Sequence, residues 1–441
     1  MQSNSEAFGS PGITPKWTSS SKEGVGTAYS TSSRVWFTVS HGILNEVYYP
    51  TIDRPQIRDL QFLISDGETF FHEERRDLDS EIELIARDAL GYRITSTDPA
   101  GRYRIIKEII SDPHQPCVLI HASIATSAEW SDRLRVYVLL APHLQVGGWG
   151  NSAQRIQLTG KDVLVAWKNS THLAMDVDVG FVKTSCGYVG ASDGWQDLRD
   201  NFQMDWQFSH ADDGNIALIG QIDLTKRKRF TLGLSFGDTR HAAVSTLAQS
   251  LSAPFAEHRT RYIEQWRRVC SGVANLDKFS GDGGRLYRIS HGLLLAHEDK
   301  TFAGAFIASA SIPWGEARGD EDLGGYHLVW NRDMVNSASG LLACDDTVTP
   351  LRALIYLACS QRPDGGFPQN FWLDGTSYWS GIQLDEVAFP VMLAWRLWKA
   401  DALGEFNPYP MVKNAAAFLI RQGPMTQQER WEENSGYSPS T

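Results

Sequence analysis

Three short segments of the sequence bring carboxylate, amide or guanidinium groups together with aromatic side chains. Aromatic rings offer flat apolar faces, and paired polar groups hold hydroxyls through two hydrogen bonds at once. Carboxyl groups in addition supply general acids and bases. This combination indicates a binding site for sugar rings with acid–base chemistry within reach.

The first segment is His327-Leu-Val-Trp-Asn-Arg-Asp-Met334, at a point where a loop leads into a helix. Adjacent Arg332 and Asp333, flanked by Trp330 and Tyr326, suit a grip on two hydroxyls of one sugar beneath an aromatic wall. The alternative is structural, with Asp333 as a helix cap beside a neighbouring salt bridge.

The second segment runs from Tyr378 to Glu386 and also stands at a loop-to-helix junction. Its polar and aromatic set consists of Trp379, then Gln383 four residues later, then Asp385. The same residues are explained by a second helix cap, formed by Asp385 and Glu386, with a buried tryptophan.

The third segment is Arg430-Trp-Glu-Glu-Asn-Ser-Gly-Tyr437. Two adjacent carboxylates, Glu432 and Glu433, usually form a solvated acidic corner. Beside Trp431 and Tyr437, one of them would lie against an apolar wall that raises its pKa, as a general acid at neutral pH requires. Because adjacent side chains diverge, the two glutamates should play different roles.

Other candidate sites are weaker. The acidic stretch 316–322 could hold calcium, but it lacks the spacing of an EF-hand, so a structural calcium ion has no clear motif behind it. Five cysteines without a close pair indicate reduced, mostly buried thiols. The sequence contains no phosphate-binding loop, dinucleotide fingerprint or serine-hydrolase motif.

Composition excludes several classes of protein. The 441 residues carry 41 Lys and Arg against 52 Asp and Glu, a formal charge of −11, which argues against nucleic acid as a partner. No stretch is apolar enough for a membrane span, and the first residues do not resemble a secretion signal, so a cytoplasmic location is expected. With 15 tryptophans, the chain has ample aromatic surface for sugar rings.

The spacing of apolar residues divides the chain into two regions, and the helices and strands of these regions must position the candidate residues. Up to about residue 240, apolar and polar residues alternate in short runs, which predicts an antiparallel sandwich of large sheets. The clearest runs are Arg34–Val39, Ile57–Ile64, Glu81–Ile85, Arg102–Ile110, Cys117–Ala125, Arg133–Leu139, Asp162–Trp167, Asn215–Leu224 and Arg229–Phe236.

Beyond that point, apolar residues recur at helical spacing and long loops separate the helices. The predicted helices are Ala242–Leu251, Pro254–Val269, Leu286–His297, Asp333–Leu342, Thr349–Ser360, Leu384–Lys399 with a kink at Pro390, and Val412–Arg421. The candidate residues thus fall at helix starts.

The ordered motifs resemble the glucoamylase and glucodextranase family of inverting glycoside hydrolases, in its prokaryotic form, over the whole chain. The motifs are Ser311-Ile-Pro-Trp-Gly315, Gly325-Tyr-His-Leu-Val-Trp330, Phe367-Pro-Gln-Asn-Phe-Trp372, Gln383-Leu-Asp-Glu-Val-Ala-Phe-Pro390 and Arg430-Trp-Glu-Glu-Asn-Ser-Gly-Tyr-Ser-Pro439. The resemblance implies an N-terminal antiparallel β-supersandwich (1–240), a helical linker (241–284) and the N-terminal part of an (α/α)6-barrel catalytic domain (285–441).

The same resemblance implies a role for each candidate residue. Glu432 corresponds to the general acid, Glu433 to a residue that contacts sugar hydroxyls near the cleavage point, and Trp431 to a substrate-binding aromatic wall. The remaining residues correspond to substrate-binding positions, with Arg332 and Asp333 holding the terminal glucose and Trp379 near the acid. These positions are Tyr326, Trp330, Arg332, Asp333, Trp379, Gln383 and Asp385.

The implied reaction is release of glucose, with inversion, from the non-reducing ends of an α-glucan, a maltooligosaccharide or an isomaltooligosaccharide, and it requires no cofactor. The family's general base lies far downstream of the Trp-Glu-Glu motif, and this chain has no matching position. We therefore expect a truncated barrel with little or no hydrolytic activity on its own. We predict no metal ligands. Linkage preference and oligomeric state stay open.

Two other functions fit part of this pattern. Inverting disaccharide phosphorylases share the implied architecture but use one carboxylic acid with phosphate, and the Trp-Glu-Glu context disfavours them. A glucan-binding protein that cleaves nothing is the alternative outside enzymes, and it would retain sugar without releasing glucose.

Overall fold

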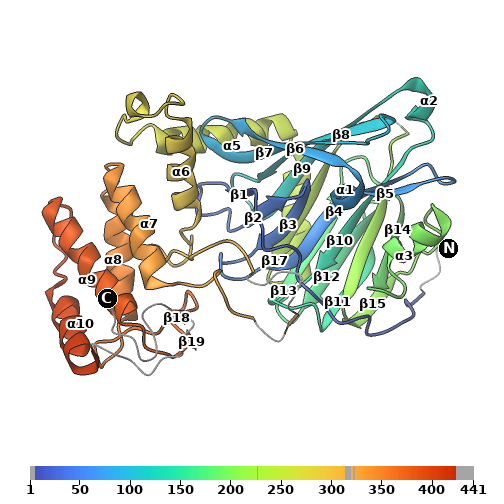
Figure 1. The fold of residues 1–441 in the computed structure, drawn as a ribbon. Helices are drawn as coiled ribbons and strands as arrows, with labels where there is room; N and C mark the ends of the chain where they lie inside the picture. Colours follow the sequence, from blue (N-terminus) through green and yellow to red (C-terminus); the bar gives the residue numbers. More distant parts are fainter. Residues whose placement is uncertain (1–4, 226, 313–318, 321–322, 424–441) are drawn as a thin grey trace. The chain divides into compact units, whose positions relative to one another are not determined.

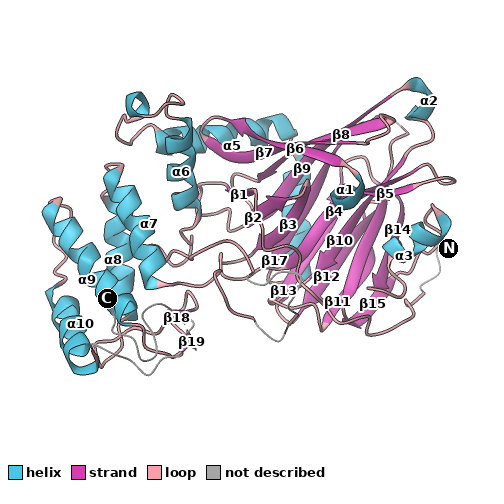
Figure 2. Ribbon diagram, viewed as in Figure 1, coloured by secondary structure: helices cyan, strands magenta, loops and turns pink. Residues whose placement is uncertain are grey.

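The computed structural model describes residues 5–225, 227–312, 319–320 and 323–423 (Figure 1). Figure 2 separates a strand-rich part from a helix-rich part by colour. The strands are β1 (Gly24–Thr27), β2 (Trp36–Ser40), β3 (Ile43–Tyr48), β4 (Ile57–Ser65), β5 (Phe71–Glu73), β6 (Asp79–Ala86), β7 (Ala89–Thr97), β8 (Tyr103–Ser111), β9 (Cys117–Thr126), β10 (Arg135–Pro142), β11 (Asn151–Leu158), β12 (Lys161–Lys168), β13 (Thr171–Val177), β14 (Phe181–Tyr188), β15 (His210–Gly214), β16 (Ile216–Ile222), β17 (Arg229–Gly237), β18 (Asn370–Phe371) and β19 (Ser377–Trp379).

Helices dominate after β17. The helices are α1 (Glu74–Asp77), α2 (Ala128–Ser131), α3 (Gly194–Asn201), α4 (Arg240–Ser252), α5 (Phe255–Cys270), α6 (Arg285–Ala296), α7 (Asn331–Ala343), α8 (Val348–Ser360), α9 (Leu384–Lys399) and α10 (Tyr409–Gln422), with a 3-10 turn at Asp277–Phe279. Among the residues that the structure describes, no helix combines the length and apolarity that a membrane span needs.

Two large antiparallel sheets form the strand-rich part. One has eight strands in the order β1-β2-β3-β4-β10-β16-β14, with β5 paired to β4, and the other has nine in the order β15-β11-β12-β13-β17-β9-β8-β7-β6. Their inner faces share one apolar core, in which Phe62 of β4 meets Phe230 of β17 edge to face at 5.6 Å. The predicted antiparallel sandwich is therefore confirmed.

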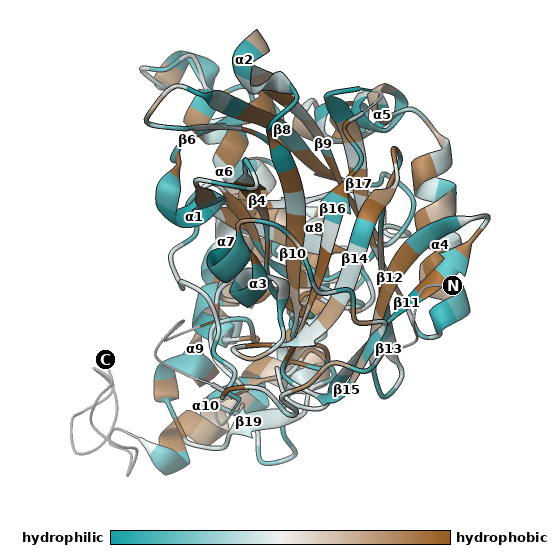
Figure 3. Cartoon of the chain, turned by 90° about the vertical axis from the view of Figure 1, so that its right-hand side faces the viewer, coloured by the Kyte–Doolittle hydropathy of each residue, from teal (hydrophilic) through white to brown (hydrophobic). Residues whose placement is uncertain are grey.

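Burial explains why these segments form strands. Figure 3 shows hydrophobic residues concentrated in strands such as β8 and β10. Along β10, Val136, Val138 and Leu140 enter the shared core, whereas Tyr137 and Leu139 lie on the other face beneath α3. This alternation is the period of two that the sequence shows.

Helix α4 packs directly on the nine-stranded sheet because β17 offers glycines there. A Cβ atom on Gly233 would meet Leu247 of α4 at 2.6 Å, and one on Gly237 would meet the backbone nitrogen of Ala243 at 2.6 Å. The hydroxyl of Ser235 donates to the carbonyl of Ala243 at 2.7 Å. Helix and sheet thus approach at backbone distance.

The chain divides into two compact units, each built from three segments that are not consecutive in the sequence. The first, here the β unit, comprises residues 1–50, 54–267 and 313–323. The second, the helical unit, comprises residues 51–53, 268–312 and 324–441. The three domain ranges inferred from the sequence stay predictions.

Within the helical unit, α7 packs against α8 and α9, and α9 packs in addition against α10. The predicted helices coincide with α4 to α10 to within three residues at each end. Helix α9 continues through Pro390, at the position where the sequence predicted a kink.

Candidate functional site

The first turns of α7 and α9 meet, although more than fifty residues separate them in the chain (Figure 1). The side-chain amide of Asn331 donates to the backbone carbonyl of Glu386 at 3.0 Å. The backbone N–H of Arg332 donates to Glu386 Oε2 at 3.0 Å. The carboxyl group of Glu386 in α9 thereby accepts an N–H at the start of α7 that no carbonyl of that helix can satisfy.

Arg332 lies at the centre of this junction. Its Nη1 donates to Asp385 Oδ2 and lies 3.6 Å from Glu386 Oε1. Burial works against the guanidinium charge, but Glu386 and Asp385 outweigh that cost, and the pKa of Arg332 is raised above its ordinary value. The structure thus pairs Arg332 with carboxylates of the second segment and not with its neighbour Asp333.

Asp333 is half-buried in the same turn of α7. Burial raises the pKa of its carboxyl above the ordinary value, although Arg332 acts in the opposite direction. It does not cap the helix, because the cap position is Trp330, whose side chain makes no cap hydrogen bond. The structural interpretation of Asp333 as a cap is therefore wrong.

Glu386 is the residue of this junction to which the sequence assigned only a capping role. Its side chain is fully buried, and burial raises its pKa to about 8 against the opposing influence of Arg332. Its Oε1 atom has no hydrogen-bond partner among the described residues. Its contacts with Arg332 cross from α9 to α7, so no pattern within its own segment indicated them.

An aromatic wall lies beside the charged junction. The rings of Tyr326 and Trp330 are 6.1 Å apart, and Trp330 meets Trp379 at 5.8 Å, nearly perpendicular. Trp379 in turn packs against Tyr378 at 5.5 Å. Tyr326 is 48% exposed, so one end of the wall is open to a ligand. The structure thus brings together aromatic residues of the first two segments.

Short β pairings hold this wall in place. The backbone of Ser309 donates to the carbonyl of Tyr326 at 2.7 Å. The backbone N–H of Trp379 donates to Asn370 Oδ1 at 2.9 Å, where β18 and β19 pair. Tyr326 and Trp379 therefore sit on backbone that is fixed by hydrogen bonds.

Gln383, the residue just before α9, is 1% exposed. Neither its amide nitrogen nor its amide oxygen has a hydrogen-bond partner among the described residues. The same holds for Asn331 Oδ1, at the start of α7, and for Asn370 Nδ2, in β18. Each buried polar atom without a hydrogen-bond partner costs about 1–3 kcal/mol of folding free energy. Hydrogen bonds to the hydroxyl groups of a bound ligand would remove that cost.

The remaining predicted site residues, Trp431, Glu432 and Glu433, lie outside the described residues, as does most of the stretch 316–322 that could hold calcium. Within the described ranges, no group of three or more His, Cys, Asp and Glu side chains could hold a metal ion.

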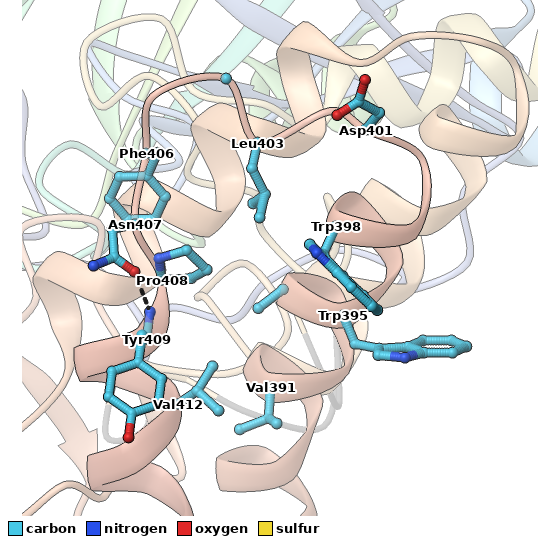
Figure 4. A pocket seen from close by; sticks show the side chains of 12 residues that line it. Val391, Trp395, Trp398, Asp401, Leu403, Phe406, Asn407, Pro408, Tyr409 and Val412 are labelled. Carbon is cyan, nitrogen blue, oxygen red and sulfur yellow. Dashed lines mark hydrogen bonds between the residues drawn. The ribbon is translucent and has the colours of Figure 1, made fainter.

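A hollow of about 740 Å³ lies between α9, α10 and the loop that joins them, away from the α7–α9 junction (Figure 4). Its walls are mainly apolar and include Trp395, Trp398, Leu403 and Val412, with Asp401 and Asn407 at its edge. It lacks the paired charges of the α7–α9 junction, which is therefore the better candidate for chemistry.

Known protein families match an N-terminal and a C-terminal part of the chain. Residues 7–271 match the family described as glucodextranase, domain N, and residues 365–441 match glycosyl hydrolases family 15. A glucoamylase of Clostridium sp. (strain G0005) is 39% identical over 438 residues, which are 99% of this chain and 61% of that protein.

A solved bacterial glucoamylase in complex with acarbose superimposes with a TM-score of 0.92 at 38% identity, over 99% of this chain and 63% of that one. The chain thus spans somewhat under two thirds of these relatives. The first family covers more than half of the chain, and the likeness to glucoamylases extends along nearly all of it. The chain therefore belongs to the glucoamylase and glucodextranase family of glycoside hydrolases.

Proposed function

We propose that the chain binds the non-reducing end of an α-glucan at the α7–α9 junction and belongs to an enzyme that releases glucose from it with inversion. In this proposal Arg332 and Asp333 hold the terminal glucose, and Tyr326 and Trp330 cover its face. Trp379, Gln383 and Asp385 extend the site toward the bond that is cleaved. Substrates are maltooligosaccharides or isomaltooligosaccharides.

The observation that carries the proposal is the junction itself. Asp385, Glu386 and Arg332 form one hydrogen-bonded group at two helix starts, and the Trp330–Trp379 wall borders it. Sugars are bound by charged and amide groups that grip hydroxyls while aromatic faces cover the ring. The acarbose complex of a 38% identical relative supports an oligosaccharide as the ligand.

The acid step is assigned to Glu432, which follows Trp431 in the family motif. It protonates the glycosidic oxygen while a base activates water on the opposite face, the two carboxyl groups lying about 6.5–9.5 Å apart. Glu433 contacts hydroxyls near the cleaved bond. Support for this assignment comes from the match of residues 365–441 to glycosyl hydrolases family 15.

The same proposal includes an (α/α)6 barrel, of which α6 to α10 would form part. Apolar side chains of α9 and α10 are exposed: Trp395 at 57%, Trp398 at 61% and Tyr409 at 66%. Exposed patches of this kind mark surfaces that another element covers. In the relatives, the portion that this chain does not span would supply those helices.

The binding part is tested by isothermal titration of the 441-residue chain with maltotriose and with isomaltotriose. Arg332→Gln should weaken binding of the preferred sugar by at least about tenfold, because a charge-assisted hydrogen bond of about 1.5–3 kcal/mol is lost. Trp330→Ala should weaken it similarly through loss of the aromatic wall.

The matched control is Arg288→Gln, because Arg288 of α6 also holds a carboxylate, Asp277 at 2.7 Å, but lies outside the junction. This variant should bind sugar as the wild type does. If the wild type binds neither sugar, or if Arg332→Gln binds as tightly as the wild type, the junction is not the glucan site.

A further inference from the structure

Two short segments of the helical unit pair next to the site residues that they carry. The backbone N–H groups of Val329 and Phe371 each donate to the other residue's carbonyl, at 3.0 Å and 3.2 Å. Trp330 directly follows Val329. Asn370, whose Oδ1 accepts the N–H of Trp379 at 2.9 Å, directly precedes Phe371. The pairing therefore fixes the backbone from which the Trp330–Trp379 wall is built.

Asp53 bridges the same two segments one step further along. His327 lies two residues before Val329, and Leu373 lies two residues after Phe371. In an antiparallel pairing these two positions face each other. The Nδ1 atom of His327 donates to the backbone carbonyl of Asp53 at 2.8 Å, because a carbonyl only accepts. The N–H of Leu373 donates to Asp53 Oδ2 at 3.2 Å, so one residue accepts a hydrogen bond from each segment.

Asp53 is itself held in place by its neighbours in the sequence. The hydroxyl of Thr51 donates to Asp53 Oδ1 at 2.5 Å. The N–H of Ile52 donates to Asp299 Oδ2 at 2.9 Å, and the other oxygen of Asp299 accepts two backbone N–H groups of its own turn. Residues 51–53, Asp299 and both paired segments belong to the helical unit. The Asp53 carboxylate is therefore oriented from within the unit that carries the site.

Burial makes the contacts of Asp53 consequential. Asp53 is 2% exposed and Leu373 is 1% exposed. When one partner of a buried hydrogen bond is removed, the other is left with the full cost of its lost solvation. Without the Asp53 carboxylate, the Leu373 N–H would be unsatisfied and the pairing would lose its support on that side. No local motif indicates this link, because His327 and Leu373 lie 274 and 320 residues from Asp53.

We propose that Asp53 is a positioning residue of the glucan site. Its carboxylate and its carbonyl hold residues 327–330 and 370–373 together, and this pairing sets the positions of Trp330 and Trp379 against a bound sugar. Asp53 contacts no sugar itself in this proposal. The part that concerns sugar affinity rests on the proposed function, whereas the part that concerns the pairing does not.

Hydrogen–deuterium exchange of the 441-residue chain tests the pairing. In Asp53→Ala, the amides of Val329 and Phe371 should exchange about three- to tenfold faster, because the pairing opens more often without its support. These two amides donate to each other's carbonyl groups and not to Asp53. Their exchange therefore reports the pairing and not the deleted hydrogen bond.

Two further variants separate the hydrogen bond from the charge and from folding. In Asp53→Asn, the amide oxygen still accepts the Leu373 N–H, and the Thr51 hydroxyl then accepts from the new NH2 group, so exchange should stay within about twofold of the wild type. Thr51→Val keeps the carboxylate but removes the hydroxyl that orients it, and exchange should rise by about two- to threefold. If Asp53→Ala does not fold, Thr51→Val decides alone.

Affinity for maltotriose, measured by isothermal titration, tests the link to the site. It should fall about three- to tenfold in Asp53→Ala, because the aromatic wall must then be ordered on binding, and it should stay near the wild-type value in Asp53→Asn. The matched control is Asp346→Ala. Asp346 Oδ1 also accepts backbone N–H groups, from Val348 at 3.1 Å and Thr349 at 3.0 Å, but at the start of α8 and in neither paired segment. This variant should match the wild type in both measurements.

Wild-type exchange of Val329 and Phe371 in both Asp53→Ala and Thr51→Val would overturn the proposal. A loss in Asp53→Asn or Asp346→Ala as large as in Asp53→Ala would do the same, and so would faster exchange with unchanged maltotriose affinity. If the wild type binds no maltotriose, the proposed function fails, and the exchange rates still decide whether Asp53 holds the pairing.

Discussion

At the scale of single residues, the α7–α9 junction places one arginine among three carboxyl groups in a poorly solvated position. Arg332 reaches Asp385 and Glu386, and the buried Glu386 carries a pKa raised to about 8. A carboxyl group whose pKa is pushed upward by burial holds its proton at neutral pH. The protonation state of Glu386 therefore affects both the folding stability and the charge that Arg332 presents to a ligand.

A pH-dependent stability follows from Glu386. Its pKa is raised on folding from 4.5 to about 8, so between these values the folded chain keeps a proton that the unfolded chain has released. The stabilisation is complete below pH 4.5 and is lost as the pH rises through 8. Relative to Glu386→Gln, the wild-type free energy of unfolding should fall by at most about 1.4 kcal/mol per pH unit in that window.

Urea unfolding of both proteins at intervals from pH 4.5 to 8 measures this difference. The control is Glu257→Gln on α5, whose side chain is 56% exposed, and it should follow the wild-type curve. Parallel curves for the wild type and Glu386→Gln would show that Glu386 does not change its proton affinity on folding.

The sequence predicted which residues gather at the junction better than it predicted how they pair. Spacing within one segment suggested that Arg332 and Asp333 act together, but in the first turn of α7 the guanidinium reaches across to α9. Pairing between segments depends on helix packing, which local spacing does not contain. The same reason hid Glu386, whose partner lies 54 residues away.

At the scale of elements, strands with alternating residue types were predictable, and β3 was not. In β6 (Asp79–Ala86), charged and apolar residues alternate from Glu81 to Leu84. β3 (Ile43–Tyr48) is buried at every position and includes Asn45 and Glu46, so it shows neither alternation nor a continuous apolar run. Its partner strands, not its own pattern, make it a strand.

The contact of α4 with β17 provides a prediction at this scale. Gly237→Ala would place a methyl group 2.6 Å from the backbone nitrogen of Ala243, and backbone cannot rotate away as a side chain does. We expect a loss of about 1–3 kcal/mol in the free energy of unfolding. Gly281→Ala is the matched control, since its added methyl meets nothing within 4 Å.

Guanidinium unfolding followed by tryptophan fluorescence measures both variants. A Gly237→Ala protein as stable as Gly281→Ala would mean that α4 moves away from the sheet at little cost, and that the close approach of helix and sheet is not needed for stability.

At the scale of the whole molecule, the two units differ in how their apolar surface is covered. The β unit encloses its core between two sheets. The helical unit leaves Trp395, Trp398 and Ile420 exposed, the last at 82%. The chain spans 61% and 63% of the relatives that it matches. These exposed side chains lie on α9 and α10.

The proposed function separates binding from turnover in a polypeptide of residues 1–441. Inversion needs an acid and a base on opposite faces of the sugar. Glu432 is the proposed acid, and the family resemblance places the base farther along the sequence. At the junction, Asp385 and Glu386 are engaged by Arg332, and Asp333 is proposed to hold the sugar. We expect this polypeptide to bind maltotetraose without hydrolysing it.

Glucose release from maltotetraose, followed by a coupled assay beside a binding titration, tests this expectation, with Glu432→Gln as the matched variant. Both proteins should bind the sugar, and neither should release glucose above the rate of the uncatalysed reaction. Release by the wild type that Glu432→Gln abolishes would show that residues 1–441 already contain a base, and Asp333, the junction carboxyl that Arg332 leaves unpaired, would then be the first residue to replace.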